Sequence, residues 1–187
     1  MAIKILYYFI LFLNFSLLFS FKCGHDKIKK TPKILNDSFI KNNSTRRLDD
    51  SYHSISFFVD YSQIEYDGYG TKEYINFIKK SIDSTLEVFS NLLKVKRSEK
   101  ISISKPYECT DEITKYDSSI VRGVDNDIIL VPIIDPYLED GVDAAASACY
   151  LAPNDKRPIM GFVLLNQNYA YKKIMLKNFL QCFCFME

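Results

Sequence analysis

The stretch Asp127-Ile-Ile-Leu-Val-Pro-Ile-Ile134 decides the fold class, because seven uncharged residues, six of them aliphatic, follow one another after Asp127. A short apolar run bounded by turn residues is typical of a strand buried on both faces of a sheet. Pro132 has no N–H to donate, so we expect its end of the strand to lie at an edge or a bulge. A second run, Ile159-Met-Gly-Phe-Val-Leu-Leu165, predicts another buried strand.

Upstream of these runs the pattern changes from strand to helix. The stretch Ser54-Ile-Ser-Phe-Phe-Val-Asp-Tyr61 is rich in β-branched and aromatic residues, which predicts a strand. From Thr71 to Lys94, apolar residues recur every three or four positions. This spacing predicts one long helix with Thr71 as its N-cap and one buried stripe: Tyr74, Ile78, Ile82, Leu86, Phe89 and Leu93.

The remaining elements are less sharply marked. We expect a short strand at residues 101–104 and irregular structure at residues 105–124. The segment Ala144-Ala-Ala-Ser-Ala148 predicts either a helical turn or a tightly packed segment, and residues 171–185 predict an apolar helix. The order of strand, long helix, three strands and helix predicts an α/β (α+β) chain, in which one long helix backs a mixed twisted sheet.

Length and charge limit the function classes. The 187 residues suit one domain with an appendage, and 48% apolar residues exclude a wholly disordered chain. The net charge of +1 argues against nucleic acid as a partner. The charge is unevenly spread, because residues 22–47 carry eight Lys or Arg against two Asp, and residues 48–187 carry 15 against 21 Asp or Glu. This asymmetry predicts two parts with different roles.

The first 20 residues predict a targeting segment rather than part of a folded domain. Lys4 precedes a 15-residue, mainly apolar stretch, and Ser20 follows it. This is typical of a secretory signal peptide, although an uncleaved anchor is the alternative. Residues 21–50 predict a basic pro-segment with a dibasic pair, Arg46-Arg47, or else an ordinary charged loop. We therefore expect a secretory-pathway protein that is extracellular or on the cell surface.

Three stretches together carry a resemblance to a known family. The first is Lys22-Cys-Gly-His-Asp-Lys-Ile28, and the second is Tyr52-His-Ser-Ile-Ser-Phe-Phe-Val-Asp-Tyr-Ser62. The third is Asp143-Ala-Ala-Ala-Ser-Ala-Cys149, followed after a short loop by Lys156-Arg-Pro-Ile-Met-Gly-Phe-Val-Leu-Leu-Asn166. In this order and spacing, residues 22–166 resemble the leishmanolysin family of secreted zinc metallopeptidases.

The resemblance implies a zincin-like N-terminal subdomain. Residues 159–166 would form the strand that borders the cleft, and the helix starting near Tyr171 would be the active-site helix, crossing below an edge strand. Members of the family use zinc to cleave protein or peptide substrates. They are also linked with surface adhesion, which leaves a membrane surface open as a partner.

The catalytic motif itself has no counterpart in the sequence. A zinc helix needs two histidines at i and i+4 with a glutamate between them, and the only histidines are His25 and His53. We therefore assign no catalytic residue and no metal ligand to any position. Residues 51–187 are predicted to be an incomplete zincin-like peptidase domain, truncated at the active-site helix, inactive on its own and without bound zinc.

The cysteines have separate predicted roles. By the resemblance, Cys23 matches the pro-segment cysteine whose thiolate would hold the zinc of a full-length enzyme latent. Cys109 and Cys149 suit a disulfide, because each lies beside a predicted strand and the predicted compartment is oxidising. Cys182 and Cys184 would then be unpaired or bonded to sequence that is absent.

Two other readings stay open beside a truncated metalloendopeptidase. The chain could be a non-catalytic secreted module for adhesion or binding, although we expect a sheet without its active-site helix to expose its lower face. It could also be an unrelated secreted α/β domain. That last reading would gain if the alanine-rich segment and Arg157-Pro158 lay far apart in space.

Overall fold

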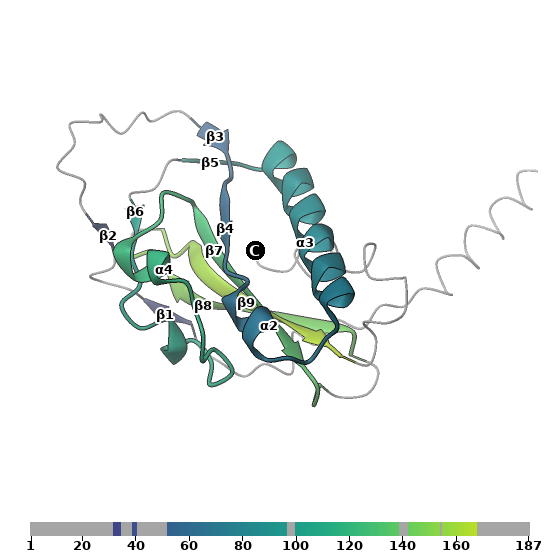
Figure 1. Ribbon diagram of the computed structural model, residues 1–187. Coiled ribbons are helices and arrows are strands. Elements are labelled where there is room, and N and C mark those ends of the chain that lie inside the picture. Colours follow the sequence, from purple (N-terminus) through teal and green to yellow (C-terminus); the bar gives the residue numbers. More distant parts are fainter. Residues whose placement is uncertain are drawn as a thin grey trace, which may run out of the picture.

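The computed structural model describes residues 32–34, 39–40, 52–96, 100–138, 142–153 and 155–167. Its centre is a five-stranded sheet with the order β1-β8-β9-β7-β4 (Figure 1). The strands are β1 (Lys33–Ile34), β4 (Phe57–Val59), β7 (Ile128–Asp135), β8 (Ala144–Leu151) and β9 (Pro158–Asn166). β4, β7 and β9 run parallel to one another, β8 is antiparallel to β9, and β1 is parallel to β8. The predicted α/β class with a mixed sheet is confirmed.

Smaller elements surround the sheet. Two two-stranded ribbons pair β2 with β6 and β3 with β5. Their strands are β2 (Phe39–Ile40), β6 (Lys100–Ile101), β3 (Tyr52–Ser54) and β5 (Lys94–Lys96). The helical elements are α2 (Ser62–Tyr66), α3 (Lys72–Leu92), the 3-10 turn η2 (Pro106–Glu108) and α4 (Ser118–Arg122).

The long helix α3 matches its prediction closely. The Thr71 side chain accepts a hydrogen bond from the Tyr74 N–H at 3.2 Å, so Thr71 is the N-cap. The first four residues of the predicted stripe are buried against the sheet. Leu93, the last member, lies beyond the helix and is 44% exposed, because the chain turns there into β5.

Apolar side chains pack against both faces of the sheet. On one face, α2 and α3 contact the β7 residues Leu130 and Ile134. On the other, apolar residues of the segment between β6 and β7 surround Ile129, Val131 and Ile133. Figure 1 shows α3 and α4 lying apart on either side of the central strands. Apolar residues within the described ranges therefore pack on both faces of the sheet.

The strand predicted at residues 54–61 is two strands. It breaks between β3 and β4 at Ser56, whose carbonyl accepts the N–H groups of Asp127 and Ile128 at 3.0 and 3.2 Å. This contact joins β4 to the start of β7, whereas β3 turns away to pair with β5. Local propensity gives no sign of that break, because it depends on a residue 71 positions away.

Pro132 lies in β7, at the end of the strand that has an open edge on the β4 side, as its missing N–H predicts. Leu130 directs its carbonyl toward β4, where it accepts the Asp60 N–H at 2.9 Å. In a parallel strand, alternate backbone groups face the same neighbour, so the nitrogen of Pro132 faces the same side as Leu130. β4 has already ended at Val59, so no strand on that side needs a hydrogen bond from residue 132.

Three further expectations can be compared with the structure. Of the two alternatives for the alanine-rich segment, the helical turn is wrong, and the segment is a tightly packed part of β8, because pairing with β9 overrides the helix propensity of alanine. The segment predicted to be irregular at residues 105–124 contains η2 and α4. The strand predicted at residues 159–165 is β9, which lies between β8 and β7.

Several predictions fall outside the described residues. They are the signal peptide, Cys23, Arg46-Arg47, the helix at residues 171–185, Cys182 and Cys184. Among the helices within the described ranges, none is long and apolar enough to cross a membrane.

Candidate functional site

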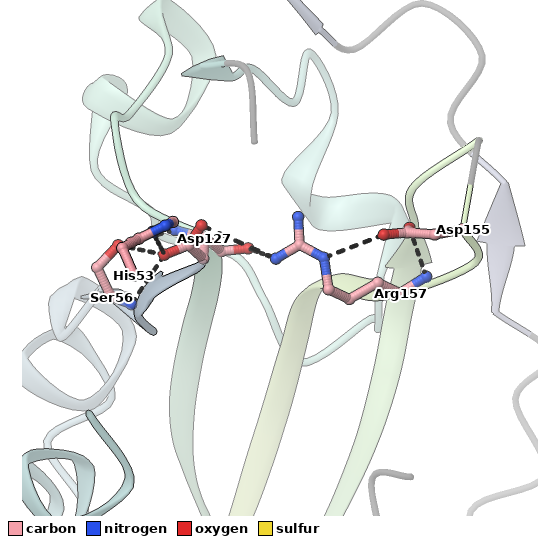
Figure 2. A network of polar contacts seen from close by, with 5 residues as sticks. All are labelled: His53, Ser56, Asp127, Asp155 and Arg157. Carbon is pink, nitrogen blue, oxygen red and sulfur yellow. Dashed lines mark hydrogen bonds and ion pairs between the residues drawn. The ribbon is translucent and has the colours of Figure 1, made fainter. Parts of the chain in front are cut away.

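A polar network joins the beginnings of the parallel strands β4, β7 and β9 (Figure 2). Its centre is Asp127, the residue before β7, whose side chain is only 3% exposed. His53 comes from β3, Ser56 precedes β4, and Arg157 precedes β9. Segments distant in the sequence therefore meet at one carboxylate.

One oxygen of Asp127 receives most of the hydrogen bonds. Its Oδ2 accepts the Ser56 N–H at 2.9 Å and the Ser56 hydroxyl at 2.7 Å. His53 Nε2 lies 3.0 Å from the same oxygen. The Asp127 N–H in turn donates to Ser56 Oγ at 3.1 Å, so the two residues bind each other reciprocally.

These contacts keep Asp127 ionised. Burial by itself would raise the pKa of this carboxyl group, because it penalises the charged form. The hydrogen bonds from the Ser56 side chain and N–H, together with His53, outweigh that effect and hold the pKa of Asp127 below its ordinary value. The network is therefore built around a buried negative charge.

Arg157 approaches the same carboxylate from the β9 side. Its Nη1 lies 3.9 Å from Asp127 Oδ1 and 3.5 Å from the Asp127 carbonyl oxygen. Its Nε lies 3.6 Å from Asp155 Oδ2, and its N–H donates to Asp155 Oδ1 at 3.0 Å. The guanidinium group thus lies between a buried and an exposed carboxylate, as Figure 2 shows.

The arrangement differs from that of a nucleophilic relay. In such a relay the nucleophile bonds to the base, and the base bonds to a third, orienting group. Here Ser56 and His53 both converge on the same oxygen of Asp127. His53 Nδ1 is buried and has no hydrogen-bond partner within the described ranges. This geometry suits the joining of strands better than the activation of a hydroxyl group.

The carboxyl ends of the parallel strands also carry buried polar residues. Ligands often bind at this edge of open α/β sheets. Asp60, after β4, accepts the N–H of Ser62 at 2.9 Å and that of Asp117 at 2.7 Å. Gln63 Oε1 accepts the Thr114 N–H at 2.8 Å. These side chains are occupied in holding the 114–117 loop against α2.

The motif Arg157-Pro158-x-x-Gly161 owes its residue types to packing. Arg157 reaches Asp127, and Pro158 is the first residue of β9, where a strand tolerates proline. A Cβ on Gly161 would lie 2.9 Å from the carbonyl oxygen of Ser147 on β8. Only glycine allows the two strands to approach this closely without a shift.

The predicted cysteine pair is brought together. Cys109 and Cys149 form a disulfide, with their Cα atoms 5.1 Å apart and both residues buried. Cys149 occupies a register shift between Ala148 and Tyr150 in β8. The proposed latency residue, Cys23, lies outside the described residues.

Sequence reasoning missed the network because its members are far apart in the chain. The His53 side chain is 34% exposed, yet it also bonds to Asp127. Nothing local distinguishes Asp127 from any other aspartate that precedes a strand. Arg157 was noticed only as part of a motif.

The described part of the chain contains no group of three or more His, Cys, Asp or Glu side chains that could hold a metal ion. No protein-family model and no curated protein matches the sequence.

Proposed function

We propose that the chain is the N-terminal portion of a leishmanolysin-like zinc metalloendopeptidase of the secretory pathway. The observation that carries the proposal is the pairing of the two halves of its most specific motif. Ala144, Ala146 and Ala148 of the first half lie opposite Leu165, Val163 and Gly161 of the second half. The reading as an unrelated domain would have gained if these segments lay far apart, and it does not gain from this pairing.

The fold is compatible with the finer proposal of a zincin-like subdomain. Such a subdomain has a twisted sheet backed by a long helix, which corresponds to the β7–β9 region and α3. The residues proposed for the active-site helix follow directly after β9 in the sequence. Within the described ranges, three or more His, Cys, Asp or Glu side chains are nowhere grouped so that they could hold zinc.

The test is to express the complete product of the transcript and to assay cleavage of a fluorescent protein substrate with and without a zinc chelator. The proposal predicts cleavage that the chelator abolishes and that added zinc restores. Residues 1–187 serve as the matched control and are expected to be inactive. Cleavage insensitive to the chelator, or no cleavage by the complete product, would contradict the proposal.

A second candidate is a non-catalytic secreted module for adhesion or binding. It is favoured by the packing of described residues on both faces of the sheet, which a self-sufficient domain requires. This candidate predicts that residues 48–187 form a soluble monomer that unfolds cooperatively in urea. Aggregation, or a gradual transition without a baseline, would count against it.

A further inference from the structure

The N-terminal strand β1 and the disulfide meet at one corner of the sheet. Lys33 of β1 lies opposite Tyr150 of β8, the residue after Cys149. The Lys33 ammonium group also forms an ion pair with Glu108 Oε2 at 3.3 Å, and Glu108 directly precedes Cys109. Both contacts of Lys33 are therefore made by immediate neighbours of the bonded cysteines.

The disulfide fixes the turn that presents Glu108. η2 is linked to β8 by the disulfide and by the Tyr150 hydroxyl, which donates to the Lys105 carbonyl at 2.9 Å. Within the turn, Lys105 Nζ lies 2.9 Å from Glu108 Oε1. That contact is local and does not depend on β8. The contact between Glu108 and Lys33 does depend on β8, because β1 is paired with β8.

The contacts between β1 and the other described residues are largely exposed to solvent. It is two residues long, Ile34 is 47% exposed, and the ion pair joins side chains that are 57% and 36% exposed. An ion pair as exposed as this one contributes little to binding. The position of β1 must therefore depend on a rigid surface beneath it.

We propose that the Cys109–Cys149 disulfide builds the surface on which β1 docks. This docking surface consists of Glu108, Tyr150 and Leu151. β1 lies against β8 in the oxidised chain and leaves it on reduction. A dithiol supplies the two electrons, so that the disulfide becomes two thiols and the dithiol becomes a cyclic disulfide. Oxidation in the secretory pathway would then come before docking of β1.

A carbodiimide tests the proposal on the full chain, because it joins an ammonium and a carboxylate in contact as an amide and takes up the water released. Two products are quantified by mass spectrometry: Lys33–Glu108, which reports docking, and Lys105–Glu108, which is local and serves as the internal control. In a Cys109→Ser/Cys149→Ser variant, we expect the ratio of the first to the second to fall about tenfold, as for coupled sites. An unchanged ratio would overturn the proposal.

A third cross-link controls for loss of the fold. Lys79 and Glu65 form an ion pair between α3 and α2, far along the chain from the disulfide. Their product is expected to be equal in the variant and the wild type. If it disappears, the variant has unfolded, and a measurement on the wild-type chain decides instead.

That measurement uses reciprocity, because two coupled sites must affect each other equally. If the disulfide favours docking, a Lys33–Glu108 cross-link must make the disulfide harder to reduce. Reduction of Cys109 and Cys149 is followed by differential alkylation over a range of dithiothreitol concentrations. We expect the midpoint to rise about tenfold in the cross-linked chain, and equal midpoints would refute the coupling.

Discussion

Replacing Asp127 by Asn removes the charge on which Ser56 and His53 converge while keeping the shape of the side chain. Three hydrogen bonds reach Asp127 Oδ2, at 2.9, 2.7 and 3.0 Å. A hydrogen bond to a charged group is worth about 1.5–3 kcal/mol, and one between neutral groups about 0.5–1.5 kcal/mol. Losing the charge weakens each of the three bonds by about 1–1.5 kcal/mol and should therefore lower the free energy of unfolding by about 3–4.5 kcal/mol at neutral pH.

Asp155→Asn is the matched control, because Asp155 contacts the same Arg157 but its side chain is 61% exposed. Asp155→Asn should lower the free energy of unfolding by less than about 0.5 kcal/mol. Urea unfolding followed by circular dichroism, with linear extrapolation, gives both free energies. Equal costs for the two variants would refute the view that burial of Asp127 makes its charge important.

The cost of Asp127→Asn should also depend on pH. The folded-state pKa of Asp127 lies below its ordinary value of 3.8, so its ionised form stabilises the fold above that value. This contribution is lost as the pH falls through the folded-state pKa. The asparagine does not titrate, so the difference between wild type and variant should narrow below pH 3.8. A difference that does not change with pH would contradict the assignment.

Three other substitutions test the packing. Loss of the Cys109–Cys149 disulfide, whose partners are 40 residues apart, should lower the free energy of unfolding in urea by about 4 kcal/mol. A change near zero would contradict the presence of this disulfide in the folded chain. Gly161→Ala should cost about 1–3 kcal/mol, because its Cβ meets a backbone carbonyl of β8; a neutral result would show that the strands can separate. Ile78→Ala should cost about 2–5 kcal/mol, whereas Val88→Ala, on the exposed side of α3, should cost less than about 0.5 kcal/mol, and equal costs would show that the stripe is misplaced.

The elements governed by local periodicity could be predicted from the sequence. The helix α3 was predicted with its N-cap at Thr71. Six apolar residues that recur at helical spacing over residues 74–93 leave little ambiguity between helix and strand. The long apolar runs gave β7 and β9 for a similar reason. In these segments, burial and propensity favour the same structure.

Elements governed by distant contacts could not be predicted. The alanine-rich part of β8 has helix propensity, and only its pairing with β9 makes it a strand. The break at Ser56 depends on Asp127, which no local pattern connects with it. The candidate site shares this property, since its four main residues come from three separate parts of the chain, around residues 53–56, 127 and 157. The disulfide was the exception, because Cys109 and Cys149 were paired in the sequence analysis and are joined in the structure.

The central claim is that this chain is the N-terminal portion of a zinc metalloendopeptidase. The most direct measurement is the sequence of the transcript immediately after the codon for Glu187. The account predicts that a reading frame there encodes a helix with the pattern His-Glu-x-x-His. A transcript that encodes this pattern in no frame would contradict it.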